Sequence, residues 1–357
     1  MKTKPLKFVL IVILFIFCAC SNGDKNGTSF TLESFGSQHT LSGRIEYKND
    51  SLFLGNPKSL RFHPGGLLII EDVGTPKFIT IIDLKTNRIQ KIISQGKGPG
   101  EMIISWGPQI LNDSLYAFCG ELRKVLIFSP DNNRHFVLRD EFLIDEKGSD
   151  RFHPVSPKMH VCLSNLGEDK RLTFLDEKGK IVRKMGGFPH TLNENEITPD
   201  NEIFSSTITS SPEGTKIVLA CTLDDILEIY DKDNGLVKRI QGPLGLKLTV
   251  IRENFGNGYM LRTMPRYLTY GNIIAGDNEF WVTYNGIKVQ RGKPPSLQEQ
   301  YTIQIFCFDW NGKPIRIIKP DCPVISFDVD WNRKILYAIK WEKDDYKIIS
   351  YSLAKIL

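Results

Sequence analysis

The tetrapeptide Arg-Phe-His-Pro occurs twice in the chain, at residues 61–64 and 151–154. A pair of histidines could bind a metal ion or transfer protons, because the imidazole group titrates near neutral pH. The alternative is structural: the aromatic ring packs between units of the fold, histidine and proline end a strand, and arginine is solvated. We favour the structural interpretation and expect the two imidazoles to lie far apart.

A glycine-rich, basic segment, Gly-Lys-Gly-Pro-Gly-Glu, covers residues 96–101. It differs from a phosphate-binding loop, which needs Lys followed by Ser or Thr directly before a helix. Here Pro99 and Glu101 follow on an extended stretch. We therefore predict a structural turn, with Lys97 and Glu101 as candidate binding residues at the rim of a pocket.

Three long segments are candidates for specific recognition, because connections of more than about 12–15 residues tend to be functional or disordered. They are 188–201, 242–270 and 285–300. In the second, aromatic residues alternate with arginine and methionine, which suits stacking on sugar rings or anchoring a protein partner. The alternative is that these side chains cap the core. The candidate binding residues are Phe255, Tyr259, Arg262, Arg266 and Tyr267.

The first twenty residues resemble a bacterial lipoprotein signal. Three lysines precede an apolar run, Phe8 to Phe17, that is too short to span a hydrocarbon core of roughly 30 Å. The segment 17–20, Phe-Cys-Ala-Cys, resembles a lipobox, in which cleavage leaves a lipidated cysteine at the new N-terminus. We predict a signal peptide at 1–19, lipid on Cys20 and a flexible tether at 20–28. The alternatives are an ordinary secretory signal and an uncleaved anchor.

A short apolar strand that ends in a small or polar residue recurs six times, at 67–71, 115–119, 159–162, 217–221, 280–283 and 335–339. Most copies are preceded by a short extended segment and followed by a hairpin with an Asp- or Asn-rich turn, so that each unit holds four strands. Six such units predict an all-β fold, a six-bladed β-propeller with four-stranded blades. A β-sandwich is the alternative, but it does not explain the repeat.

The last unit, 324–352, contains only three clear strands. We predict that the N-terminal segment 29–47 supplies its fourth strand and closes the ring, since closure removes exposed sheet edges. Residues 29–357 are accordingly predicted to form one propeller domain.

Composition limits the partners and the chemistry. The formal charge of +5 falls to near +2 without the three lysines of the signal, which excludes an electrostatic nucleic-acid binder. Cys119, Cys162, Cys221 and Cys307 lie in apolar, strand-like runs, and we predict that they are buried thiols rather than disulfides or ligands. No zinc-type spacing and no GxSxG elbow occurs, so we predict no metal site and no cofactor.

The stretch Ile93–Met102, which contains Gly98-Pro99-Gly100-Glu101, together with the lipobox and the sixfold repeat, resembles the six-bladed β-propeller lipoproteins of Bacteroidetes, which are related to TolB-like and NHL-like propellers. This resemblance implies a propeller fold and an outer-membrane or other cell-envelope location, and no particular reaction.

Two functions fit these observations. The first is a non-enzymatic, monomeric binding or scaffold module that is anchored through the lipid on Cys20 and holds an envelope protein or an oligosaccharide on its loops. The alternative is a metal-dependent lactonase, hydrolase or lyase. Lactonase-like propellers hold a divalent ion at the channel mouth with Glu, Asn and Asp, and under this alternative a calcium-like ion would lie in the central channel. Oxygen ligands are available at Asp72, Asp113, Asn165, Asp224 and Asp277, although no spacing singles them out.

Overall fold

The computed structural model describes most of the chain from residue 27 to the C-terminus. The described residues are 27–47, 52–164, 170–189, 192–193, 204–246, 249–256, 258–290, 304–342 and 345–357. The predicted signal peptide, the predicted lipidation site at Cys20 and residues 20–26 of the predicted tether lie outside these ranges. No helix in the described ranges is long and apolar enough to cross a membrane.

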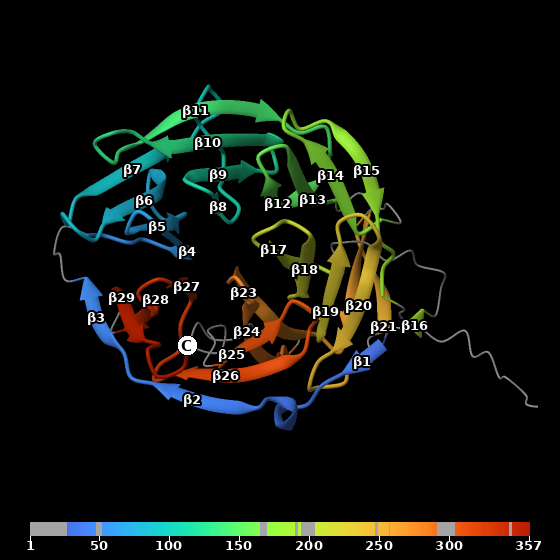
Figure 1. Ribbon diagram of the computed structural model, residues 1–357. Coiled ribbons are helices and arrows are strands. Elements are labelled where there is room, and N and C mark those ends of the chain that lie inside the picture. The colour runs from blue at the N-terminus through green and yellow to red at the C-terminus, as the bar shows by residue number, and fades with distance from the viewer. Residues whose placement is uncertain are drawn as a thin grey trace, which may run out of the picture.

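Six sheets with four antiparallel strands each form a ring, as Figure 1 shows. We call them blades 1 to 6 in chain order. Blade 1 contains β4 (Pro57–His63), β5 (Leu67–Asp72), β6 (Lys77–Asp83) and β7 (Ile89–Ser94). Blade 2 contains β8 (Gln109–Leu111), β9 (Ser114–Cys119), β10 (Lys124–Pro130) and β11 (Phe136–Leu143). Blade 3 contains β12 (Ser149–Ser156), β13 (Met159–Ser164), β14 (Leu172–Asp176) and β15 (Ile181–Met185).

The second half of the ring repeats this order from the inner to the outer strand. Blade 4 contains β17 (Ser206–Ser210), β18 (Lys216–Cys221), β19 (Ile226–Asp231) and β20 (Gly235–Gln241). Blade 5 contains β23 (Tyr267–Ala275), β24 (Glu279–Lys288), β25 (Gln304–Asp309) and β26 (Pro314–Pro320). Blade 6 contains β27 (Ser326–Asp330), β28 (Ile335–Glu342), β29 (Asp345–Ser352) and, as its outer strand, β3 (Arg44–Tyr47). The predicted six-bladed β-propeller is confirmed.

The N-terminal segment closes the ring, as predicted. Strand β3 pairs with β29 in antiparallel register, with Ile45 opposite Ile349. The same segment also adds strands that the sequence did not suggest. β1 (Gly27–Ser29) pairs in parallel with β20, and β2 (Ser37–Leu41) pairs in parallel with β26. In Figure 1 the blue N-terminal ribbon therefore runs along the outer edges of blades 4, 5 and 6.

The recurring apolar strand is the second strand of every blade. All six residues of β5 are buried, and the equivalent strands of the other blades also carry core residues. Six of the hydrophobic clusters each join two neighbouring blades, so that the apolar face of one sheet packs on the next sheet. The repeat is therefore the pattern that builds the ring, because one blade cannot bury both of its faces alone.

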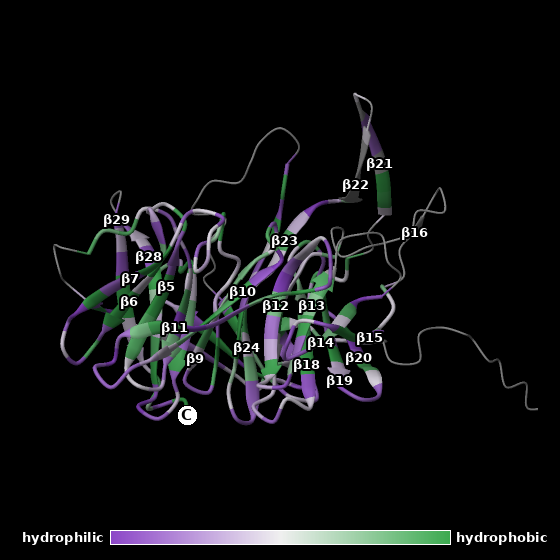
Figure 2. Ribbon diagram, turned by 90° about the horizontal axis from the view of Figure 1, so that it is seen from above, coloured by the Kyte–Doolittle hydropathy of each residue, from purple (hydrophilic) through white to green (hydrophobic). Residues whose placement is uncertain are grey.

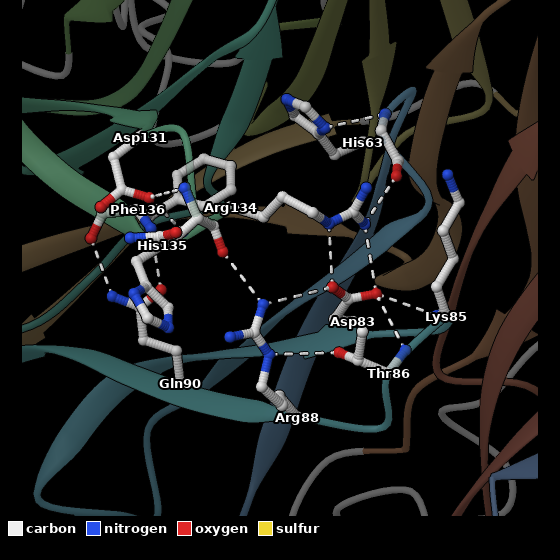
Figure 3. A network of polar contacts seen from close by, with 12 residues as sticks. His63, Asp83, Lys85, Thr86, Arg88, Gln90, Asp131, Arg134, His135 and Phe136 are labelled. Atoms are coloured by element: carbon white, nitrogen blue, oxygen red, sulfur yellow. Dashed lines mark hydrogen bonds and ion pairs between the residues drawn. The ribbon is translucent and has the colours of Figure 1, made fainter.

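Polar contacts also join the blades, and Figure 3 shows those between blades 1 and 2. Asp83, at the end of β6, accepts a hydrogen bond from Arg134 Nε at 2.9 Å. Gln90 and the backbone of Phe136 exchange two hydrogen bonds of 2.8 Å. These contacts fix the hairpin of blade 2 against the outer half of blade 1.

The strand order sorts the connections onto two faces. Connections from the first to the second strand and from the third to the fourth lie on one face, which we call the turn face. Connections from the second to the third strand, and from each outer strand to the next blade, lie on the opposite loop face. The described ends of the segments 188–201, 242–270 and 285–300 leave their strands on the loop face.

The prediction of an irregular connection at 242–270 is wrong for much of its length. The segment contains β21 (Thr249–Phe255) and β22 (Gly258–Met264), which pair as an antiparallel hairpin, and the start of β23. The two-residue strand β16 (Leu192–Asn193) pairs with β21. Figure 2 shows the hairpin standing out from one face of the ring.

Two smaller expectations are also confirmed. The only helical element in the described ranges is η1 (Leu32–Ser34), a single turn. Cys119, Cys162, Cys221 and Cys307 are buried, and the five cysteines of the described ranges form no disulfide.

Candidate functional site

The inner strands of the blades surround a central channel that contains two cavities. The loop-side cavity, of about 430 Å³, is lined at the loop face by Val73, Trp106 and Ile325. The turn-side cavity, of about 390 Å³, is lined by residues of the strand 1 to strand 2 connections, Asn112 and Pro212 among them. Three residues, Arg61, Gln109 and Ile273, line both cavities. The two cavities therefore adjoin at these three residues.

Arg61 lies on β4 and is 9% exposed. Its Nη1 donates hydrogen bonds to Asn272 Oδ1 of blade 5 at 2.8 Å and to the Leu60 carbonyl at 3.1 Å. Burial lowers the pKa of the guanidinium, and the carboxyl groups of Asp328 and Glu71 oppose this shift. Because an arginine pKa starts far above neutral, the group stays charged.

Two carboxyl groups near Arg61 are held by other partners. Asp328 of β27 accepts hydrogen bonds from the backbone N–H groups of Phe62 at 2.9 Å and Val329 at 2.8 Å, which ties blade 6 to blade 1. Glu71 accepts one from Ser59 Oγ at 3.1 Å and one from the Gly107 N–H at 2.9 Å. Burial raises the pKa of both carboxyl groups. Neither forms an ion pair with Arg61 within 4.0 Å in the described ranges.

Cationic and aromatic side chains form the wall of the loop-side cavity. Arg151 lies over the ring of Trp106, with its guanidinium carbon 5.7 Å from the ring centroid. Trp106 is held by a hydrogen bond of 3.1 Å from its Nε1 to Glu121. Lys58, on β4, is exposed. Such a wall can bind an anionic or planar ligand.

His153 lines the turn-side cavity and carries an imidazole, a group that many enzymes use for acid-base catalysis. Its Nε2 lies 2.9 Å from Ser210 Oγ, and its buried Nδ1 makes no hydrogen bond. Burial lowers the pKa of His153 to about 3, with smaller contributions from Arg61 and His160. The imidazole is therefore neutral at physiological pH.

The two Arg-Phe-His-Pro segments lie at equivalent places in blades 1 and 3. The aromatic rings pack between blades, as predicted: Phe62 stacks on Tyr337 of blade 6 at 5.5 Å, and Phe152 on Phe118 of blade 2 at 5.6 Å. The prediction of solvated arginines is wrong, because β4 and β12 are inner strands and direct Arg61 and Arg151 into the channel.

The histidines of these two segments each contact the following blade. His63 Nε2 lies 3.7 Å from the Asp113 carboxylate of blade 2, while His153 contacts Ser210 of blade 4. His63 belongs to the surroundings of the blade 1 to blade 2 contacts, as Figure 3 shows. The two imidazoles therefore have separate partners and do not form a joint site.

The Gly-Lys-Gly-Pro-Gly-Glu segment is a turn that connects β7 to β8. Gly100 has a φ of 68°, which favours glycine, and its N–H donates to Glu141 at 2.7 Å. Glu101 Oε2 accepts from the Gly98 N–H at 2.9 Å, and Lys124 donates to the Gly98 carbonyl at 2.8 Å. The predicted structural turn is confirmed.

The candidate binding residues whose side chains the structure describes do not line the two channel cavities. Lys97 is exposed, and neither it nor Glu101 lines the two channel cavities. Arg266 is exposed and Tyr267 is half-buried at the start of β23. The side chains of Phe255, Tyr259 and Arg262 lie outside what the structure describes. A binding role for these residues stays a prediction.

The carboxylates considered as calcium ligands are separated as well. Asp72 accepts hydrogen bonds from the N–H groups of Gly55, Asn56 and Gly74 at 2.7–3.0 Å, so it holds a turn. Asp113 is exposed near His63, and Asp277 is exposed on the turn face. Asp224 is buried, and Asn165 lies outside the described residues. Within the described ranges, no three His, Cys, Asp or Glu residues are placed to hold a metal ion.

Sequence reasoning missed the residues that form the loop-side cavity. No sequence motif contained four of them, Lys58, Glu71, Trp106 and Asn272. The other two, Arg61 and Arg151, were predicted to be exposed to solvent. A usable signal was present, since residues that precede the recurring apolar strand must lie on inner strands once a propeller is assumed.

Comparison with known proteins agrees with this fold. A protein from Bacteroides fragilis whose name describes it as exported has a similar structure, with a TM-score of 0.52, 13% identity, and coverage of 91% of this chain and 98% of its own. The β-propeller domain of Swd1 from Myceliophteria thermophila has a TM-score of 0.46 and 14% identity, with coverage of 86% and 99%. No curated protein matches the sequence. The model of the TolB-like six-blade propeller family matches residues 36–332. The chain therefore belongs to the TolB-like six-bladed propeller family.

Proposed function

We propose that this protein is a binding module of the cell envelope, anchored by a lipid on Cys20, that holds a ligand or partner on its loop face. One observation carries the proposal: the cation-lined cavity and the described ends of the three long segments lie on the same face of the ring. A closed ring of packed blades is a rigid support, and long connections on such a support are where binding residues concentrate.

The predicted signal supports the location. An apolar run of this length with a basic start fits a cleaved signal, and acyl chains on a cysteine contribute about 0.8 kcal/mol per buried CH₂ to membrane binding. We propose the outer membrane as the anchoring membrane, following the resemblance to propeller lipoproteins.

The anchor is tested by expressing the full chain in a Gram-negative host with labelled palmitate. The wild-type protein and C18S should both carry label and sediment with membranes, whereas C20S should carry none. Equal labelling of C20S would reject the lipid anchor and leave an ordinary secretory signal.

Loop-face binding is tested on a glycan array with residues 20–357 carrying C20S, which keeps every residue that the structure describes. The double variant K97Q/R266Q removes two exposed charges from the loop face. The matched control, K178Q/K313Q, removes two exposed charges from the turn face. We expect about tenfold weaker binding for the first variant and unchanged binding for the second. Equal effects of both pairs would contradict a loop-face site.

A further inference from the structure

The loop-side cavity is lined by more cationic than anionic side chains. Three cationic side chains, Lys58, Arg61 and Arg151, line it together with one carboxyl group, Glu71. Glu71 is already engaged by Ser59 and by the Gly107 N–H. On the far side of Arg61, Asp328 is engaged by two backbone N–H groups. The Asp150 carboxylate lies 3.8 Å from Arg151 Nη1 but does not line the cavity.

Arg61 has hydrogen-bonding capacity that the protein does not use. Both of its hydrogen bonds leave from Nη1, and within the described ranges Nε and Nη2 donate none. These two atoms are not among the polar atoms sealed from solvent without a partner, so they are accessible in the channel, where Arg61 lines both cavities. A guanidinium with a free Nε–Nη2 edge presents two parallel donors, the geometry that matches a carboxylate. Since Arg61 is 91% buried, a ligand that pairs with it also leaves water.

Arg151 repeats this arrangement on the inner strand of blade 3. Its Nη1 donates to the Asp150 carbonyl at 2.7 Å, which again leaves the Nε–Nη2 edge without a hydrogen bond in the described ranges. The indole ring of Trp106 lies beneath this guanidinium and lines the cavity. Gln109 and Thr207 add an amide and a hydroxyl group to the wall, each of which already donates one hydrogen bond to a backbone carbonyl. Asn272 is engaged through both of its amide atoms. An aromatic platform beside amide and hydroxyl groups suits a sugar ring, which has an apolar face and a rim of hydroxyls.

We propose that the loop-side cavity binds an acidic sugar of the uronic acid class, with its carboxylate held by Arg61 and Arg151 and its ring packed on Trp106. The volume of about 430 Å³ lies in the range of small-molecule sites. This inference rests on the proposed binding function and adds the chemical class of the ligand. It involves binding alone, with no bond made or broken.

The test is calorimetric titration of residues 20–357 carrying C20S with digalacturonate, with its dimethyl ester and with a sulfated disaccharide. The ester keeps the rings and removes the charge. We expect binding of digalacturonate, at least about tenfold weaker binding of the ester, and weaker binding of the sulfated sugar. Equal binding of acid and ester, tighter binding of the sulfated sugar, or no binding of digalacturonate would overturn the proposal.

Two substitutions locate the site. R151Q should weaken digalacturonate binding about tenfold, whereas K313Q, which removes an exposed charge on the turn face, should leave it unchanged. W106L should weaken the binding of both acid and ester, because it removes the platform and not the charge. Equal affinities of R151Q and the wild type would place any sugar elsewhere and overturn the assignment.

These experiments distinguish failure of the acidic-sugar proposal from failure of the proposed binding function. A chain that binds a glycan through Lys97 and Arg266 but shows no acid preference and no effect of R151Q would overturn this inference alone. Loss of all glycan binding would overturn both.

Discussion

At the scale of single residues, buried polar groups of this ring fall into two kinds. The carboxylates of Asp72 and Asp328 accept hydrogen bonds from backbone N–H groups and so hold the chain in place. Arg61 leaves an edge of its guanidinium open toward a cavity. The first kind stabilises the fold, and the second is available to a ligand, because a buried donor without a partner gains most from one.

The carboxylate of Asp72 should be a strong stabiliser. D72A leaves three backbone N–H groups of Gly55, Asn56 and Gly74 without their acceptor, and we expect it to lower the free energy of unfolding by about 2–4 kcal/mol. Urea denaturation followed by tryptophan fluorescence measures the change. D277A, at an exposed position, should change stability by less than about 0.5 kcal/mol. A similar effect of both substitutions would contradict the assigned role.

The buried carboxyl of Asp224 should make stability depend on pH. Burial raises its pKa to about 7, with smaller contributions from Asp225 and Glu228. The folded chain therefore keeps a proton that the unfolded chain loses near pH 4, so this group lowers wild-type stability as pH rises from about 4 to about 7. D224N removes the titration and keeps an acceptor for the Asp225 N–H.

We expect D224N to gain stability relative to the wild type over this range, by at most about 1.4 kcal/mol per pH unit, and to differ little at pH 4. Taking the difference between the two proteins cancels the opposite effect of His153 and His160, whose lowered pKa values favour stability as pH rises. Thermal unfolding at pH 4, 6 and 8 measures it, with D277N as the control. A difference independent of pH would contradict the assignment.

At the scale of elements, the N-terminal segment has two separate tasks. β3 completes blade 6, whereas β1 and β2 add fifth strands to blades that already contain four. An incomplete blade exposes the edge of β29 in the ring, and an unpaired edge is a template for association with another chain.

A pair of truncated chains separates these tasks. A chain that starts at residue 43 keeps β3 and should stay monomeric, whereas a chain that starts at residue 52 lacks it and should associate or precipitate. Size-exclusion chromatography with light scattering measures the difference. Monomeric behaviour of both chains would show that closure by β3 is dispensable.

At the scale of the whole molecule, each blade shares a hydrophobic cluster with each neighbour around the closed ring. Removing one blade from the packing would expose the apolar faces of two others. The ring should therefore unfold as one cooperative unit.

Four buried thiols in four different blades can test this cooperativity. Cys119, Cys162, Cys221 and Cys307 lie in blades 2 to 5, while Cys322 is half-buried. In a chain that starts at residue 21, we expect Cys322 to react first with a thiol reagent and the other four to become reactive together as urea is raised. Peptide mass spectrometry after pulsed labelling measures each site. If the cysteine of one blade reacted at a lower urea concentration than the other three buried cysteines, that blade would unfold independently of the ring.

The hairpin β21–β22 shows where sequence patterns reach their limit. Alternating aromatic, arginine and methionine residues at 242–270 predicted a long connection for recognition, but this segment contains two strands that pair with each other and not with a blade. A sequence pattern can indicate that a segment forms a strand. Which strand it pairs with depends on the surrounding packing in the folded protein.

The amino-acid pattern predicted the propeller, its six units and its closure by the N-terminal segment. Six equivalent apolar runs at a regular spacing favour the stacking of equivalent sheets, because one sheet cannot bury both of its faces alone. The cavity could not be predicted in this way. Arg61, Trp106, Arg151 and Asn272 come from different parts of the ring, and Arg61 and its partner Asn272 are 211 positions apart in the sequence. Inner strands of different blades converge on one axis, and no local spacing records which single residues meet there.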